Sequence, residues 1–162
     1  MKEKTGRYEF VNQLLPDLLK KDKKQIILTT NLIYLILEPS EAEQLFNGFA
    51  NSDEEELQHA GKTGLETIKK EISKKTTALS HERRGFEALS EGNFEKAITE
   101  FDKAEETYPT LHQNYEISQL LREEKDNIRD KADRKRVIKK IIDDYSWKVP
   151  DEQLEILKQA AE

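Results

Sequence analysis

The spacing of hydrophobic residues predicts helices along most of the chain. Apolar side chains recur at helical spacing over residues 8–21, 53–72, 85–109 and 132–145. Residues 25–38 are apolar on nearly every side, so we expect a buried helix there and the most enclosed element of the protein. A strand is the alternative, but no second strand is present to pair with it. The pattern predicts an all-α fold of about six to eight helices.

Local signals divide the chain into these elements. Ser40 and Glu43 have the spacing of a capping box, which predicts a helix start. Gly61 and Gly64 interrupt an amphipathic helix at a cost in stability, so we expect another helix to cross closely there. The polar stretch 74–77 contains two β-branched threonines and predicts a break in that helix.

Residues 85–109 have the pattern of two amphipathic helices joined by a tight turn. The first helix ends at Gly92, and the second ends before Pro109. Small residues on the facing sides allow close approach, and aromatic residues fill the space between them. The small residues are Gly85, Ala97 and Ala104, and the aromatic ones are Phe94 and Phe101.

This stretch resembles a tetratricopeptide repeat (TPR), a helix–turn–helix unit of about 34 residues. The resemblance covers about residues 79–110 and is best from Gly92 onward; His81, Arg84 and Ala88 depart from the family's apolar or aromatic positions. A generic helical hairpin is the alternative. The resemblance implies a right-handed stack of antiparallel helices with the TPR-like hairpin at its centre. We expect a single domain, 1–162, with N-terminal helices in 1–76, the hairpin in 77–110 and capping helices in 111–162.

The resemblance also implies a binding surface. In TPR proteins the first helix of each repeat lines a concave groove that receives a peptide or a partner helix. The matching positions here are Leu79, Glu82, Phe86 and Leu89. Three apolar residues and one acid suit an amphipathic helix or an extended hydrophobic segment. The alternative is that the chain's own N-terminal helices fill this surface and make these residues core.

Charge adds a second candidate surface. Charged residues make up 37% of the chain and the formal net charge is −6, which argues against general nucleic-acid binding. One predicted helix is nevertheless basic, and this patch is a candidate for phosphate, RNA, DNA or an acidic partner. Interleaved aspartates favour an ordinary solvated face. The basic residues are Arg129, Lys131, Arg134, Lys135, Arg136, Lys139 and Lys140.

Several chemistries find no support in the sequence. The chain has no cysteine, and its histidines (His59, His81 and His112) lie on different segments, so we expect no metal site. Lys62 and Thr63 resemble the end of a phosphate-binding loop, but the required first glycine is missing. No nucleophile, base and orienting group can be picked out. We therefore expect no enzyme activity and no cofactor.

The leading functional hypothesis is a non-catalytic adaptor or assembly module that binds a protein or peptide through a TPR-like scaffold. The partner can also be a second copy of the chain, paired across a two-fold axis. The alternative is a nucleic-acid-associated regulator that uses the basic helix 129–140. The start of the chain lacks the apolar core of a signal peptide, and the longest apolar run is shorter than the ~20 residues that span a bilayer. We expect a cytoplasmic protein without a membrane partner.

Overall fold

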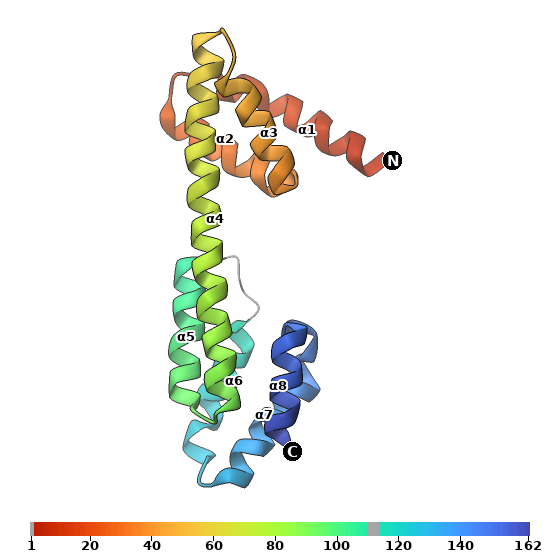
Figure 1. Ribbon diagram of the computed structural model, residues 1–162, viewed down its shortest axis with the longest axis vertical. Helices are drawn as coiled ribbons and strands as arrows, with labels where there is room; N and C mark the ends of the chain where they lie inside the picture. The colour runs from red at the N-terminus through yellow and green to blue at the C-terminus, as the bar shows by residue number, and fades with distance from the viewer. Residues whose placement is uncertain (1, 110–113) are drawn as a thin grey trace. The chain divides into compact units, whose positions relative to one another are not determined.

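The computed structural model describes residues 2–109 and 114–162, in which every regular element is helical (Figure 1). The prediction of an all-α fold is confirmed. The α-helices are α1 (Lys2–Leu18), α2 (Lys23–Ile36), α3 (Pro39–Ala50), α4 (Glu55–Ser90), α5 (Phe94–Thr107), α6 (Tyr115–Glu124), α7 (Lys131–Tyr145) and α8 (Asp151–Ala161). Short 3₁₀ turns, η2 (Lys125–Asn127) and η3 (Ser146–Lys148), follow α6 and α7.

Contacts divide the chain into two compact units, which are described separately. Unit 1 extends to Ser73, and unit 2 begins at Lys74. The expected boundary between N-terminal helices and hairpin, at residues 76 and 77, lies close to this division. The single domain expected from the chain length stays a prediction.

Unit 1 packs α1, α2, α3 and the first part of α4 around one hydrophobic core. The carboxylate of Asp22 accepts a hydrogen bond from the backbone N–H of Lys24 and so caps α2. The buried apolar residues of this core are Val11, Leu18, Ile26, Ile33, Leu37, Ala42, Phe46, Ala60 and Ile68.

The start of α3 differs from the prediction. Glu38, not Ser40, is its N-cap, and Pro39 is its first helical residue. The side chain of Glu41 accepts a hydrogen bond from the backbone N–H of Glu38 at 3.1 Å, so the capping box lies earlier than expected. Proline suits this position because its fixed φ is helical and the first helical N–H needs no partner within the helix.

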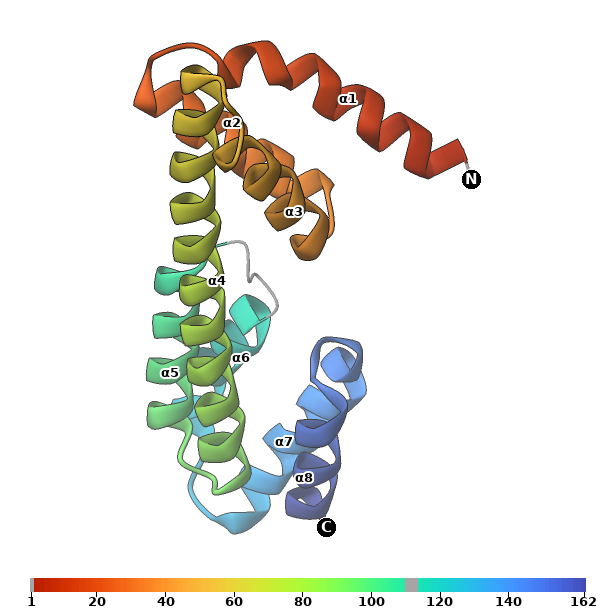
Figure 2. The ribbon, with the colours of Figure 1, turned by 45° about the horizontal axis from the view of Figure 1, so that its top comes forward.

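The close helix crossing expected at the glycines of α4 is confirmed. A Cβ atom added to Gly61 would collide with the backbone of Phe49 and Ala50, and one added to Gly64 would collide with the Phe46 ring. These contacts bring α3 against α4 (Figure 2). The two glycines lower the helix propensity of α4, but they allow α3 to approach its backbone more closely than alanine would.

Helix α2 is not the enclosed element that we expected from its composition. Its buried face carries Ile26, Ile33 and the two threonines Thr29 and Thr30. Thr30 can be buried because its hydroxyl donates to the carbonyl oxygen of Ile26 at 2.7 Å. Three leucines on another side of the same helix are exposed instead. The prediction was wrong because apolar residues on every side of a helix do not determine how many of those sides pack against another helix.

The break expected in α4 at residues 74–77 is also wrong. The helix is continuous from Glu55 to Ser90. Residues 73–77 are all exposed, so the hydrophobic stripe is interrupted there while the helix is not. Two threonines lower helix propensity by only about half a kcal/mol each, and the stretch contains neither glycine nor proline.

Unit 2 begins with the predicted helical hairpin. Helix α4 ends at Ser90, Gly92 adopts a positive φ of 74° in the turn, and the side chain of Asn93 accepts from Lys96 N–H to cap α5. The ring of Phe101 lies where a side chain on Gly85 would be, and it meets Phe86 edge-on with centroids 5.0 Å apart. The helical hairpin is confirmed, and its likeness to a TPR repeat stays a prediction.

Helices α6, α7 and α8 complete the core of unit 2. Arg122 on α6 donates to both carboxylate oxygens of Asp102 on α5, each at 2.6 Å, and joins these two helices. The buried apolar residues contributed by the last three helices and the turn before α8 are Ile117, Leu120, Leu121, Val137, Ile138, Ile141, Val149 and Leu157.

The crossing of α3 and α4 yields a stability prediction. We expect Gly61→Ala to lower the free energy of unfolding by about 2 kcal/mol or more, because backbone atoms cannot move aside for a Cβ. Gly48→Ala on α3 is the matched control, since nothing lies within 4 Å of its Cβ position. The control should gain up to about 1 kcal/mol from helix propensity. Urea unfolding followed by circular dichroism measures both, and equal effects of the two substitutions would contradict the close crossing.

Candidate functional site

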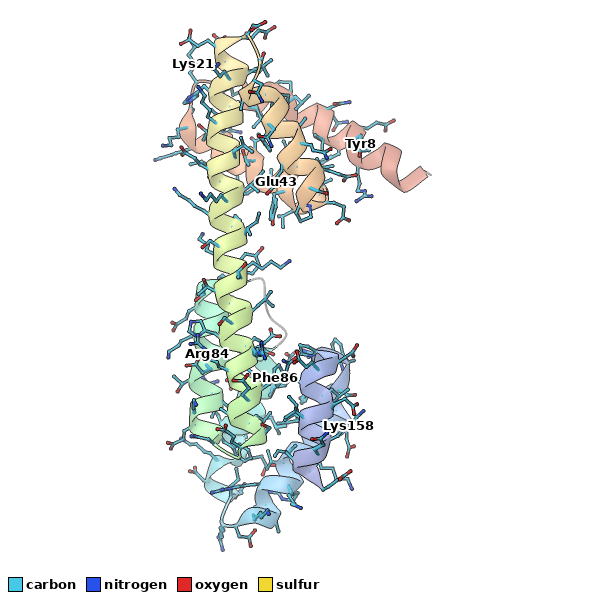
Figure 3. All side chains as sticks on the ribbon, viewed as in Figure 1. Tyr8, Lys21, Glu43, Arg84, Phe86 and Lys158 are labelled. Carbon is cyan, nitrogen blue, oxygen red and sulfur yellow. The ribbon has the colours of Figure 1, made fainter. Side chains whose placement is uncertain are left out.

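Most of the residues predicted to line a groove from the TPR resemblance are buried. Glu82, Phe86 and Leu89 are buried, and Leu79 alone among the four expected residues is exposed, at 44%. Phe86, labelled in Figure 3, belongs with Leu89 to the core formed with α5, α6, α7 and α8. The residues packed against them in this core come from α5 and the C-terminal helices, whereas the alternative considered from the sequence was filling by the N-terminal helices. Three of the four residues are therefore buried in unit 2, and binding of a partner at this surface stays a prediction.

Glu82 is the one ionisable group in that buried set. Its carboxylate accepts a hydrogen bond from Nδ2 of Asn114 at 3.1 Å, and both residues are 3% exposed. Burial raises the pKa of the Glu82 carboxyl, and the Asn114 hydrogen bond partly offsets this effect. Oδ1 of Asn114 has no hydrogen-bond partner among the described residues. A protonated Glu82 could donate to an acceptor such as this oxygen, whereas a carboxylate cannot.

A second polar cluster joins α4 to α5. Glu100 of α5 lies 2.8 Å from Nδ1 of His81, 3.2 Å from Nε of Arg84 and 3.0 Å from Nζ of Lys103. The hydrogen bond from His81, followed by the effects of Lys103 and Arg84, lowers the pKa of the Glu100 carboxyl. His81 and Arg84 are two of the positions that depart from the TPR pattern. In this chain both residues join the two helices of the hairpin through polar contacts to Glu100.

The basic helix α7 is partly neutralised by its neighbour. Glu124, at the end of α6, lies 3.0 Å from Arg136 and 3.5 Å from Lys140. The hydrogen bond from Arg136 lowers the pKa of the Glu124 carboxyl. Two of the seven predicted patch residues are thus engaged within unit 2.

Three other residues of the patch, on the first turns of α7, lie beside the C-terminal end of α4. Lys131, Arg134 and Lys135 line a recess of about 190 Å³ together with the end of α4 and Ala160 near the end of α8. The Arg134 side chain lies over Gly92. The C-terminal ends of helices carry partial negative charge that attracts cations. The C-terminal end of α4 supplies a structural reason for these three positions, whereas Arg129 and Lys139 do not line this recess.

An exposed apolar surface that we did not predict lies on α2 of unit 1. Leu28, Leu32 and Leu35 are 55%, 38% and 70% exposed. Their spacing of four and then three residues places them on one side of the helix. We call these three residues the leucine stripe. The spacing is visible in the sequence, but only the burial of the threonines on another side shows that the leucines are the ones left outside.

The histidines form no ligand set in the described part of the chain. His59 is exposed in unit 1, His81 pairs with Glu100 in unit 2, and His112 lies outside the described residues. Among the described residues, no three or more histidine, aspartate or glutamate side chains are grouped so that they could hold a metal ion.

The chain was also compared with known proteins and searched for membrane spans. No protein-family model, curated protein or solved structure matches it. Among the described residues, no helix combines the length and apolar character that crossing a membrane requires.

The buried carboxyl gives a pH-dependent prediction. The pKa of Glu82 is higher in the folded protein than in the unfolded chain. Protonation of Glu82 therefore stabilises the folded protein fully at a pH below the pKa of the unfolded chain. This stabilisation is lost as the pH rises through the pKa of the folded protein. Glu82→Gln should therefore raise the free energy of unfolding at pH 7, by about 1 kcal/mol if its amide also donates to Asn114. Below the unfolded pKa of 4.5 the difference should shrink.

Urea unfolding at pH 7 and pH 4 tests this expectation. Glu87→Gln, at an exposed position on the same helix, serves as the control and should change stability by less than about 0.5 kcal/mol. A Glu82→Gln variant that is less stable than wild type at pH 7 would show that neighbouring groups of the protein stabilise the ionised Glu82 carboxylate.

Glu100 should behave in the opposite way. Its pKa is lower in the folded protein, so its contribution to stability is present above the unfolded value of 4.5 and is lost as the pH falls through the folded value. We expect Glu100→Gln to destabilise the protein at pH 7 and to differ progressively less from wild type as the pH is lowered below 4.5. Thermal unfolding across this range measures the difference, and a difference independent of pH would show that charge at Glu100 has no role.

Proposed function

We propose that the chain is a non-catalytic protein-interaction module that binds through the leucine stripe of α2. One observation carries this proposal: α2 buries Thr29 and Thr30 while it exposes Leu28, Leu32 and Leu35. If no partner covered this side of α2, burying the leucines and exposing the threonines would cost the protein no stability. The exposed leucines suit a surface that another protein covers.

The energetic gain available at this surface is considerable for a small area. Complete burial of a leucine side chain is worth about 1.5–3 kcal/mol, and these three leucines are only partly buried within their own chain. They lie on a regular helix, so little backbone ordering is needed when a partner binds. Helices commonly present such i, i+4 and i+7 apolar residues to another helix or to an apolar groove.

The two surfaces favoured by the sequence have weaker support. Three of the four hairpin groove residues belong to the core of unit 2 and cannot meet a partner without unfolding it. Arg136 and Lys140 of the basic helix pair with Glu124, and the adjacent recess also contains the acidic Glu91. The adaptor hypothesis is therefore retained with a different binding surface, and the TPR likeness remains part of the proposal only as a scaffold.

The stripe can be tested by affinity capture from a native lysate, with bound proteins quantified by mass spectrometry. We expect wild type to capture a partner that a folded Leu32→Glu/Leu35→Glu variant loses, since the introduced carboxylates would be buried without partners. Leu79→Glu is the matched control, because Leu79 is also exposed but lies in unit 2. Circular dichroism establishes that both variants stay helical. Capture that survives in the stripe variant and is lost in the control would locate binding at the hairpin instead.

A further inference from the structure

We infer that the leucine stripe binds the same stripe on a second copy of this chain, with the two α2 helices antiparallel. This inference rests on the proposed function, because it names the partner of the same surface. It follows from the distribution of charge along α2, which gives the surface two unlike ends.

The N-terminal end of α2 is positive. Lys20, Lys21, Lys23 and Lys24 all lie at or just before the start of the helix, and all are exposed. Lys20 pairs with Asp17 and Lys21 with Glu56. Lys23 and Lys24 form no ion pair within the described part of the chain.

The opposite end is negative. Glu38 lies two residues after the end of α2, and Glu43 lies on the first turns of α3; both are exposed. The side chain of Glu38 is 69% exposed and lies 3.8 Å from Arg7, at the outer limit of an ion pair. Figure 3 labels one residue near each end of α2, Lys21 and Glu43. Between these charged ends, the stripe itself carries no charge.

An antiparallel pair fits both the leucine stripe and the oppositely charged ends of α2. When the pair is centred between Asn31 and Leu32, Leu28 of each copy lies opposite Leu35 of the other. The same pairing brings the N-terminal end of each α2, which carries Lys24, to the C-terminal end of the other, where Glu38 lies two residues beyond the helix, so that unlike charges meet at both ends. A parallel pair would place lysines against lysines and glutamates against glutamates. Charge therefore selects the antiparallel arrangement.

The pairing has two-fold symmetry, in which the same patch serves on both copies. Three leucines and their flanking lysine stems make a small interface, below the roughly 1,200–2,000 Å² of a stable complex. The dimer should consequently be weak and depend on protein concentration. Sedimentation velocity of the full chain over a concentration series measures this equilibrium.

The first part of the experiment tests the stripe. Wild type should move from monomer to dimer as its concentration rises, and Leu32→Glu should weaken the association by about tenfold or more. Leu79→Glu, the exposed-leucine control in unit 2, should leave the dissociation constant unchanged. A wild-type chain that stays monomeric over the whole series overturns the inference.

The second part tests the direction of pairing. Lys24→Glu and Glu38→Lys should each weaken self-association, because each places like charges opposite one another. An equimolar mixture of the two variants should restore it, since the mixed dimer has unlike charges at both ends. Circular dichroism checks the Glu38→Lys variant in particular, because Glu38 begins α3. A mixture that associates no better than either variant alone overturns the antiparallel arrangement.

The outcomes separate this inference from the proposed function. A chain that stays monomeric but captures a different protein through the stripe overturns the second-copy partner and leaves the interaction module standing. Self-association that depends on Leu32 and is restored in the mixture supports both. A chain that neither self-associates nor captures a partner through the stripe overturns both.

Discussion

Both hydrophobic cores use the same helix as one of their walls, and this constraint organises the rest of the structure. Ala60 and Ile68 of α4 belong to the core of unit 1, while Phe86 and Leu89 belong to that of unit 2. In unit 1, α3 approaches α4 so closely at Gly61 that a Cβ would not fit. In unit 2, the Phe101 ring takes the place of a side chain at Gly85 on the same helix. Each unit thus obtains its packing from a small residue on α4.

The elements that could be predicted from the sequence are those fixed by local chemistry. Gly92 with Asn93 marks the turn of the hairpin, and the glycines of α4 mark a close crossing. Glycine allows a positive φ or a close backbone approach whatever the rest of the fold is. The burial of α2 could not be predicted in this way. Its apolar residues surround the helix, and hydrophobicity alone cannot tell which sides find neighbours. The buried threonines show this most clearly, since Thr30 satisfies its hydroxyl within its own helix.

The candidate sites show the same limit. Phe86 and Leu89 were correctly assigned to one helix face, but the sequence does not show that α6 and α7 cover that face. The departures from the TPR pattern at His81 and Arg84 are explained only when Glu100 of α5 is seen beside them. For the basic helix, the pairing of Arg136 and Lys140 with Glu124 depends on how α6 and α7 pack. In each case the identity of a surface depends on a neighbour that lies on another helix.

The exposed stretch of α4 has a consequence for how this protein unfolds. Residues 73–77 belong to a continuous helix, yet none of them is buried. Cooperative unfolding requires that the loss of one core removes contacts from the other, and none of these five residues contributes a buried side chain to either core. The two cores can therefore have separate midpoints in a denaturation experiment. A single free energy of unfolding then describes one unit and not the chain.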